Sequence, residues 1–156
     1  MKKLRKVAFV AFVIAALGAL VAAQALGASA IFKGNGTEDP VLEIKFKRVK
    51  KHGQPAKIKN FEANDLYFTC QADPPIDPFR SGFSRDGTLD KVHNGKFSYN
   101  KVTYSESGNI KYNTRVEGEF VSKRKVKGTV KQRRTIVSDP STYCISEEEP
   151  YKALKQ

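Results

Sequence analysis

The acidic side chains that could act in catalysis gather around one proline-rich segment. Asp73 and Asp77 lie within 71–78, QADPPIDP, and Asp86 and Asp90 follow it closely. Paired carboxylates are the usual groups of glycoside hydrolysis, and clustered carboxylates can bind calcium. The spacing of a calcium-binding loop is absent, and aspartates in loops usually stabilise turns. A secreted hydrolase that uses these carboxylates therefore remains an alternative prediction.

The histidines and glycines give weaker indications of chemistry. The chain has two histidines: His52 in a Lys-His-Gly turn and His93 before Asn94-Gly95. Neither has the spacing to a cysteine that a zinc site requires, and no glycine-rich phosphate loop is present. We therefore predict that the protein is not an enzyme and that it needs neither a metal nor another cofactor.

Cations form the clearest candidate site. The formal net charge is +12, and five basic residues share one face of a predicted hairpin: Lys111, Arg115, Lys125, Lys131 and Arg133. Lys45 and Lys47 would extend this face if their strand lay alongside. The charges either keep the protein soluble or bind a polyanion, such as a cell-wall polymer, an acidic glycan or lipid headgroups. Nucleic acid is not expected, because the chain carries an export signal and Tyr112 and Phe120 are predicted to face inward.

The hairpin spans 110–136 and has the two-residue alternation of half-buried strands. Directly opposed residues of an antiparallel pair point to the same face, so the apolar faces of the two arms coincide only if paired residue numbers sum to an even number. A sum of 246 meets this condition with the shortest loop, Ser122 to Arg124. This register places Gly118 opposite Gly128 on the buried face, leaving room for a neighbouring aromatic side chain or a bend. On the buried face Gln132 and Arg134 interrupt the apolar pattern. On the outer face Glu119 opposes Lys127, and Arg115 opposes Lys131; Arg115, Lys131 and Arg133 are predicted to lack acidic partners.

The rest of the mature chain has short apolar runs separated by turns. The predicted strands are 41–49, 56–61, 66–70, 89–92, 96–104 and 150–154, beside the two arms of the hairpin. The segment 79–83 is either a short strand or a loop, and 142–145 carries the second cysteine. Asp86-Gly87 predicts a tight turn, and Asn94-Gly95 predicts a type I′ hairpin. No amphipathic helix follows the first thirty residues. The fold class is all-β: a small antiparallel β-barrel or sandwich of about eight short strands.

One strand contains a conflict of facing. In 96–104, KFSYNKVTY, Phe97 and Tyr99 have odd numbers, whereas Val102 and Tyr104 have even numbers. A β-bulge near Asn100 and Lys101 would turn all four to one side. The alternative is a regular strand with apolar side chains on both faces.

The N-terminus has the layout of a secretory signal. Four basic residues precede an uncharged run at 7–23, and Ala28-Ser29-Ala30 resembles a cleavage site. We predict a signal helix within 1–30, a flexible leader at 31–40 and a single domain at 41–156. Removing 1–30 leaves 24 basic against 16 acidic residues, a net charge of +8. Cleavage after Ala25 and retention as a membrane anchor are alternatives.

The chain has two cysteines, Cys70 and Cys144. An even number of cysteines in an exported chain predicts one disulfide. In the chain-entropy model, closing a loop of this length is worth roughly 4.5 kcal/mol. The expected location is therefore secreted or extracytoplasmic.

A family resemblance rests on short motifs between 41 and 154. The order NGKFSY, VEGEF, SKRKVKGTV and a late cysteine before a short aromatic-bearing strand resembles an uncharacterised family of small secreted bacterial β domains. In that family the last cysteine is usually followed by serine-glycine, whereas Ile145 and Ser146 follow Cys144 here. The resemblance implies a fold and a secreted location, and no activity.

Three functions follow as hypotheses. The first is a non-catalytic, monomeric domain of the cell envelope that binds anionic polymers through its basic face. The second is a barrel that carries a small ligand, which requires an internal cavity. The third is the hydrolase, which requires two of the aspartates to converge in one cleft.

Overall fold

The computed structural model describes residues 28–156, which form strands joined by turns and loops. The strands are β1 (Ala28–Gly36), β2 (Glu43–Lys50), β3 (Lys57–Gln71), β4 (Phe79–Lys91), β5 (Lys96–Tyr104), β6 (Ile110–Phe120), β7 (Lys125–Ile136), β8 (Tyr143–Ser146) and β9 (Glu149–Lys155). Within this described part, no helix has the length and apolar character needed to cross a membrane.

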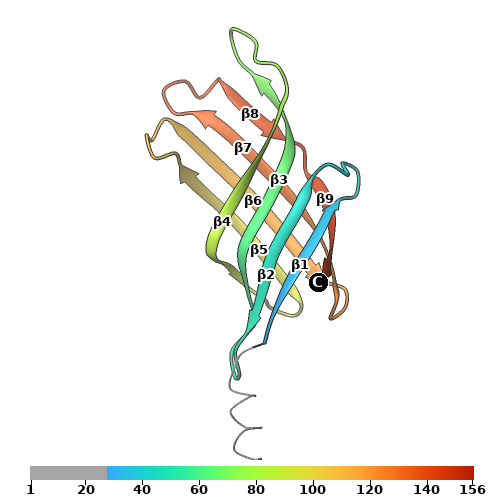
Figure 1. Ribbon diagram of the computed structural model, residues 1–156. Coiled ribbons are helices and arrows are strands. Elements are labelled where there is room, and N and C mark those ends of the chain that lie inside the picture. The colour runs from blue at the N-terminus through green and yellow to red at the C-terminus, as the bar shows by residue number, and fades with distance from the viewer. Residues whose placement is uncertain (1–27) are drawn as a thin grey trace, which may run out of the picture.

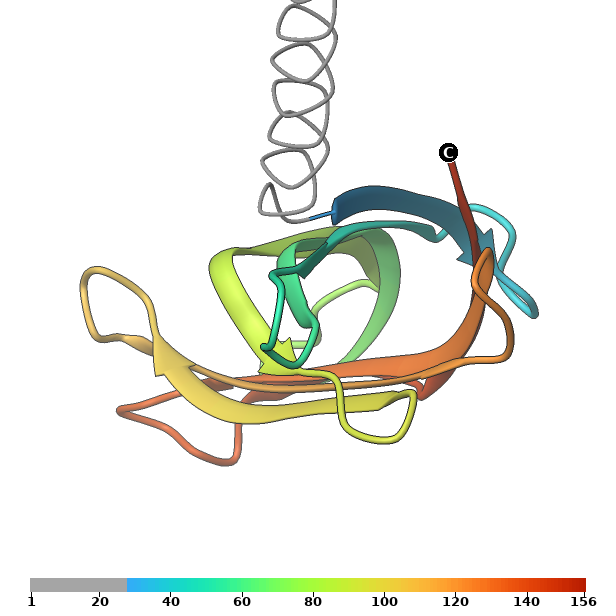
Figure 2. The same ribbon diagram turned by 90° about the horizontal axis from the view of Figure 1, so that it is seen from below.

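The nine strands belong to one antiparallel sheet, ordered β4-β3-β2-β1-β9-β7-β6-β5. The short strand β8 pairs with both β3 and β7, so the pairings β3-β2-β1-β9-β7-β8 return to β3. The sheet consequently curls around an interior, as Figures 1 and 2 show. The all-β antiparallel class is confirmed, and the single sheet replaces the two sheets of the sandwich alternative. Strands β4 and β5 are the two ends of the sheet.

The predicted flexible leader is wrong, because its first part is strand β1. This strand pairs with β2 along its length, from Ala28 opposite Lys50 to Asn35 opposite Glu43. Its second edge pairs with β9. Phe32, in the middle of β1, is fully buried. The predicted signal helix lies outside the described residues, except that 28–30 already belong to β1.

Strands β3 and β4 are longer than the sequence predicts. Strand β3 joins the two predicted strands 56–61 and 66–70, and β4 joins the segment 79–83, expected as a strand or a loop, to the predicted strand 89–92. The predicted turn at Asp86-Gly87 is wrong, because both residues lie inside β4. The register between β3 and β4 shifts beside them, and Gly87 has a left-handed φ of 77°. Its N–H donates to Oδ1 of Asn60 on β3. The Asp-Gly step therefore forms a β-bulge, where glycine accepts the backbone conformation without strain.

The predicted type I′ hairpin between β4 and β5 is confirmed. Asn94 and Gly95 both have positive φ, 49° and 78°, as that turn requires. The predicted bulge in β5 is wrong, because β5 pairs with β6 without a register shift from Lys96 to Tyr104. Val102 and Tyr104 instead face outward, with exposed fractions of 47% and 58%. The alternative of apolar side chains on both faces is correct.

The predicted register of the β6–β7 hairpin is confirmed from Ile110 opposite Ile136 to Phe120 opposite Val126. The connection is one residue longer than predicted, since Val121 also lies outside the strands. The space over Gly118 and Gly128 is filled as expected by aromatic rings. A Cβ atom on Gly118 would collide with the ring of Phe97, and one on Gly128 with the ring of Tyr151. The Tyr151 hydroxyl donates a 3.0 Å hydrogen bond to the Glu117 carbonyl.

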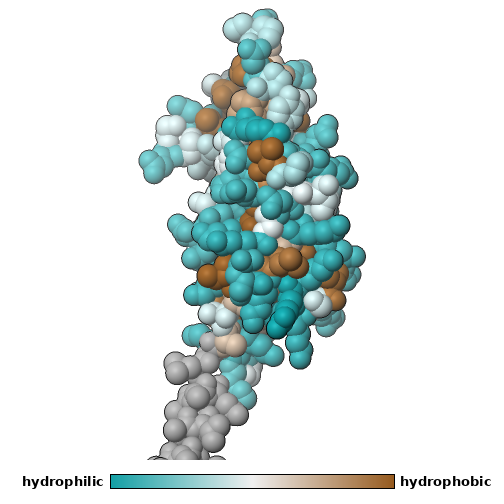
Figure 3. Space-filling model, turned by 45° about the vertical axis from the view of Figure 1, so that its right-hand side comes forward, coloured by the Kyte–Doolittle hydropathy of each residue, from teal (hydrophilic) through white to brown (hydrophobic). Residues whose placement is uncertain are grey.

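Aromatic side chains fill the interior of the curled sheet. Phe46 lies at the centre, with ring centroids 5.2 Å from Phe32, 5.8 Å from Phe61 and 5.7 Å from Phe97. Such pairs add to the burial of apolar surface that stabilises a core. On the side drawn in Figure 3, hydrophilic residues cover most of the outer surface and apolar residues form scattered patches. The core therefore lies inside the curl.

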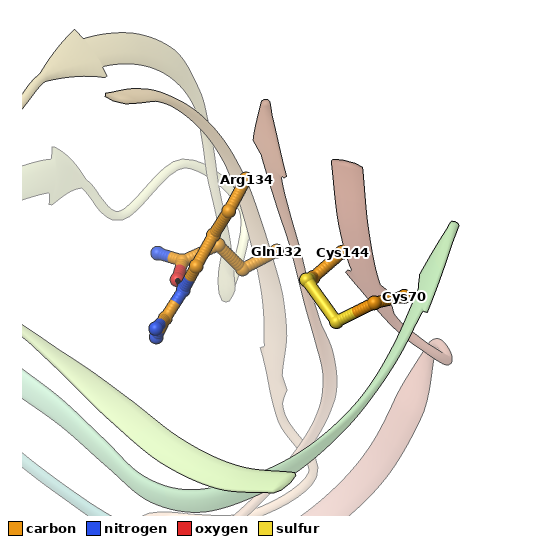
Figure 4. The surroundings of a disulfide bond; sticks show 4 residues. All are labelled: Cys70, Gln132, Arg134 and Cys144. Atoms are coloured by element: carbon orange, nitrogen blue, oxygen red, sulfur yellow. Dashed lines mark hydrogen bonds between the residues drawn. A yellow bond between two sulfur atoms is a disulfide. The ribbon is translucent and has the colours of Figure 1, made fainter. Parts of the chain in front are cut away.

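The predicted disulfide is confirmed. Cys70 and Cys144 are directly opposed residues of β3 and β8, and their sulfur atoms are bonded. Figure 4 shows the bond joining these two strands. The link holds β8 against β3 at the end of the molecule where the β3–β4, β5–β6 and β7–β8 loops lie (Figure 1).

Candidate functional site

The structure divides the predicted basic stripe into three parts. Arg115 and Lys131 oppose each other near the middle of the β6–β7 hairpin, as predicted. Lys111 and Arg133 lie nearer the open end, in adjacent rows of the ladder, opposite Thr135 and Asn113. Lys125 begins β7 at the other end, roughly 20 Å from Lys131 at the rise of an extended strand. The stripe is thus not one compact site.

Acidic side chains neutralise part of the stripe, so the prediction that Arg115 lacks an acidic partner is wrong. Its Nη2 atom lies 2.7 Å from Oε1 of Glu117, two positions along the same face. That hydrogen bond raises the pKa of Arg115, and the charge of Glu117 adds to the effect. Lys127 and Glu119 form the predicted opposite-charge pair at 3.4 Å. The extension through Lys45 is also wrong, because β2 pairs with β1 and β3, and Lys45 contacts Glu62 at 3.1 Å.

Two of the remaining cations, Lys111 and Arg133, lie beside tyrosines on the outer surface of β5, β6, β7 and β8. The Arg133 guanidinium lies 3.9 Å from the centre of the Tyr143 ring, and Tyr104 opposes Lys111 across β5 and β6. The Tyr143 hydroxyl donates to Oε1 of Gln71 at 2.8 Å, which fixes the ring in place. We call this surface the basic face; it consists of Tyr104, Lys111, Lys131, Arg133 and Tyr143. Within the described residues, no salt bridge joins its cations to an acid.

A second candidate site is a hollow between the two ends of the sheet. Near the β4–β5 hairpin the ends approach each other, and the Ser98 N–H donates to Asp90 Oδ2 at 2.7 Å. Farther along they separate and leave a cleft of about 510 Å³. The residues lining this β4–β5 cleft are Ser81, Gly82, Phe83, Ser84, Arg85, Tyr99, Thr103, Tyr104, Tyr112, Thr114, Gln132 and Arg134. The lining has two arginines and no carboxylate.

Arg134 and Gln132 form the inner wall of the cleft. Both project from β7 to the same side in Figure 4. The Gln132 side chain is 2% exposed, and its Nε2 donates to Thr114 Oγ1 at 2.9 Å. The Arg134 guanidinium lies 4.3 Å from the centre of the Phe68 ring and donates to Gln132, Ser81 and Gly82. Burial lowers the pKa of Arg134, and an electrostatic interaction with Tyr112 opposes part of this shift.

A wider groove of about 730 Å³ lies over the closed end of the β6–β7 hairpin. Its outward-facing lining carries both signs of charge, including Glu117, Glu119, Lys127 and Lys152. The groove therefore has no single charge preference.

Two of the candidate aspartates lie far apart, and one histidine belongs to a turn. Asp77 precedes β4 and Asp90 lies near its end, roughly 40 Å away along an extended strand. His93 closes the β4–β5 hairpin through a backbone bridge to Lys96. No set of three metal-ligating side chains is found in this part of the chain. The convergence that a paired-carboxylate hydrolase requires is not observed between Asp77 and Asp90.

A mixed cluster of charges lies where β8 turns into β9. Arg80 contacts Asp39 at 2.7 Å and donates to the Asp65 carbonyl at the same distance. Arg80 chiefly lowers the pKa of Asp39 through this hydrogen bond. Glu149 lies nearby, and burial followed by repulsion from Asp39 raises its pKa. The cluster couples stability to pH.

The sequence points to the basic face but not to the cleft. In the sequence Arg134 only interrupts the apolar pattern of the buried face, where its even number places it. That placement is itself the signal: a cation on an inward position needs a polar environment or an anion. Its neighbours Ser81 and Gly82 could not be found from sequence, since the approach of β4 depends on the curl of the sheet.

Comparison with known proteins returned no match: no family model, curated protein or solved structure corresponds to this chain. The resemblance to small secreted bacterial β domains therefore stays a prediction.

Proposed function

We propose that this protein is a non-catalytic, extracytoplasmic binding domain whose basic face binds acidic polysaccharide. The observation that carries the proposal is the stacking of Arg133 on Tyr143 beside Lys111, where cations and aromatic rings share one surface. A cation held on a ring keeps its N–H edges available for carboxylate groups.

The disulfide supports the location. A bond between Cys70 and Cys144 indicates an oxidising compartment outside the cytoplasm. Export through the segment 1–30, into the medium or the cell envelope, is the finer part of the proposal. Retention of that segment would instead anchor the domain to a membrane.

The tyrosines favour a polysaccharide over a lipid surface. Tyr104 is 58% exposed, and Tyr143 is half-buried with its ring under Arg133. A tyrosine offers an apolar ring with a polar edge, which suits the mixed surface of a sugar. Binding to lipid headgroups would require only the cations and would have no role for the tyrosine rings. The affinity for lipid would depend on the number of charges and would fall as salt is added.

The test is retention of the folded domain on immobilised polygalacturonate, an acidic polysaccharide, over a series of salt concentrations. The double variant Lys111→Gln/Arg133→Gln removes two charges from the basic face. The matched control is Lys47→Gln/Lys59→Gln, which removes two charges from an opposed pair on β2 and β3. We expect the first variant to elute at much lower salt and the control to elute close to the wild type.

Three results would overturn the proposal. One is absence of retention at low salt, and another is an equal loss in both double variants, which would mean that only net charge matters. The third is binding to anionic lipid vesicles with no binding to polygalacturonate, which would assign the basic face to a membrane surface.

A further inference from the structure

Arg134 is a half-buried cation whose compensation within the protein comes from uncharged groups. Oxygen atoms of Gln132, Ser81 and Gly82 accept its hydrogen bonds at 2.9, 3.0 and 3.1 Å. The side chains lining the cleft include no carboxylate. Moving a charge from water into a protein interior is costly unless an opposite charge accompanies it. The site is therefore electrostatically incomplete as the chain forms it.

The hydrogen bonds of the guanidinium leave one nitrogen available. Nε donates to Gln132, and Nη2 donates to both Ser81 and Gly82. Nη1 has no hydrogen-bond partner among the described residues, and it is not an enclosed atom. A guanidinium has five N–H donors in a fixed plane, and here two of them remain for a molecule in the cleft.

The walls of the cleft suit an organic body attached to an anionic group. Phe83, Tyr99 and Tyr112 supply aromatic surface, while Ser84 and Thr103 supply hydroxyl groups. The volume of about 510 Å³ lies in the range of small-molecule sites. A dianion such as phosphate would lose more hydration energy than a monoanion on entering this half-apolar space.

We propose that the β4–β5 cleft binds a small organic carboxylate, whose oxygen atoms accept hydrogen bonds from Nη1 of Arg134. This site shares Tyr104 with the basic face, but its cation is a different residue. Arg133 and Arg134 are consecutive on β7 and face opposite sides of the sheet, so each can be changed without removing the other.

Benzoate is a suitable probe because it joins a carboxylate to one aromatic ring, and benzamide is its uncharged counterpart. We expect a saturable response to benzoate in the amide NMR spectrum of the wild type, centred on Ser81 to Ser84 and on Thr103. Benzamide should bind about tenfold more weakly or worse, because a hydrogen bond to a charged group is worth about 1.5–3 kcal/mol.

Arg134→Gln should greatly reduce the difference between benzoate and benzamide, although Arg85, the second and exposed arginine of the lining, remains in this variant. The matched control is Arg124→Gln in the exposed β6–β7 connection, which removes the same charge and should leave benzoate binding unchanged. Thr103→Trp provides a second variant that keeps Arg134 and the β7 network but fills the cleft from the exposed edge of β5. It should also lose benzoate binding while remaining folded.

Several outcomes would overturn the proposal. No saturable benzoate response in the wild type would do so, as would equal binding of benzamide. Unchanged benzoate binding in Thr103→Trp would mean that benzoate binds outside the β4–β5 cleft. Tighter binding of inorganic phosphate than of benzoate would reject the organic carboxylate as the class of ligand.

Discussion

Nε of Arg134 donates a 2.9 Å hydrogen bond to Oε1 of Gln132, two residues earlier on the same strand. The other end of that amide donates to Thr114 on β6, and the Gln132 backbone N–H donates to Ser146 Oγ on β8. One buried residue therefore connects three strands and orients the guanidinium. A glutamine serves this role because its amide both accepts and donates a hydrogen bond.

Replacement of Gln132 tests this network. Gln132→Leu keeps the approximate size of the side chain but leaves Thr114 without its donor and Arg134 without one acceptor. We expect the free energy of unfolding to fall by about 1–3 kcal/mol, the usual cost of unsatisfied buried polar groups. Urea denaturation measures this change. Lys131→Leu, on the outer side of the same strand, should change stability by no more than about 0.5 kcal/mol; an equal loss in both variants would show that the network adds nothing.

Glu149 should make the protein less stable as the pH rises. Burial, followed by repulsion from Asp39, raises its pKa in the folded state, so the folded protein holds the proton more tightly than the unfolded chain. The stability gained from that proton is complete at pH values below the ordinary glutamate pKa of about 4.3 and is lost as the pH rises through the raised value. Glu149→Gln should therefore exceed the wild type in stability at pH 7 and lose this advantage near pH 4.

Asp39, in the same cluster of charges, should have the opposite effect on how stability depends on pH. Its pKa is lowered chiefly by the hydrogen bond from Arg80, so its contribution is present above the ordinary aspartate pKa of about 3.9 and fades as the pH falls. Asp39→Asn should be less stable than the wild type at pH 7 and approach it in acid. Parallel pH profiles for the two variants would contradict the assignment of the charges.

Gly118 and Phe97 should be energetically coupled. A Cβ atom on Gly118 would collide with the Phe97 ring, so Gly118→Ala should cost about 1–3 kcal/mol through overpacking. Phe97→Leu shortens the side chain at the point of collision. The double variant should therefore lose less stability than the sum of the two single variants. Additive losses in thermal denaturation would mean that the collision is relieved elsewhere.

The disulfide should supply a large share of the stability. It joins positions separated by 74 residues, and a loop of that length corresponds to roughly 4.5 kcal/mol in the chain-entropy model. Cys70→Ala/Cys144→Ala should lower the midpoint of urea denaturation accordingly, and adding a reductant should destabilise the wild type while leaving the double variant unchanged. A variant as stable as the oxidised wild type would mean that β8 is held by its pairing with β3 and β7 alone.

Strand β1 bears on where an exported chain would be cut. Cleavage after Ala30 would remove Ala28, Ser29 and Ala30, which pair with Lys50, Val49 and Arg48 of β2. Cleavage after Ala25 would leave all of these pairings intact. We therefore expect intact-mass measurement of the exported protein to give an N-terminus at residue 26. An N-terminus at residue 31 would mean that β1 begins later in the mature protein.

The sequence predicts pairs of strands better than it predicts their arrangement. The β6–β7 register follows from residue parity because a shift of one position would expose the apolar face. The β1 strand is missed because IFKGNGTEDP is rich in turn-forming residues, whereas its strand character depends on pairing with β2 and β9. The bulge at Gly87 is read as a turn because the same residue types serve both structures.

The two candidate sites also differ in how far the sequence predicts them. Lys111 and Arg133 are found from sequence because adjacent rows of a hairpin lie close together. Arg115 does not belong to the basic face because it forms an ion pair with Glu117. The two residues are close in the sequence, but their contact depends on side-chain direction, which residue parity does not predict. The β4–β5 cleft brings together residues from four strands, and its existence depends on the incomplete closure of the curled sheet.

The most direct test of polysaccharide binding is the place where an acidic sugar contacts the domain. Titration of the labelled protein with a short oligogalacturonate, followed by amide NMR, reports this at single residues. Binding through the basic face predicts that the shifts concentrate on 102–104, 111–113, 131–135 and 143–145, and that added salt reverses them. Shifts spread over β2 and β3, or no shifts at low salt, would contradict it.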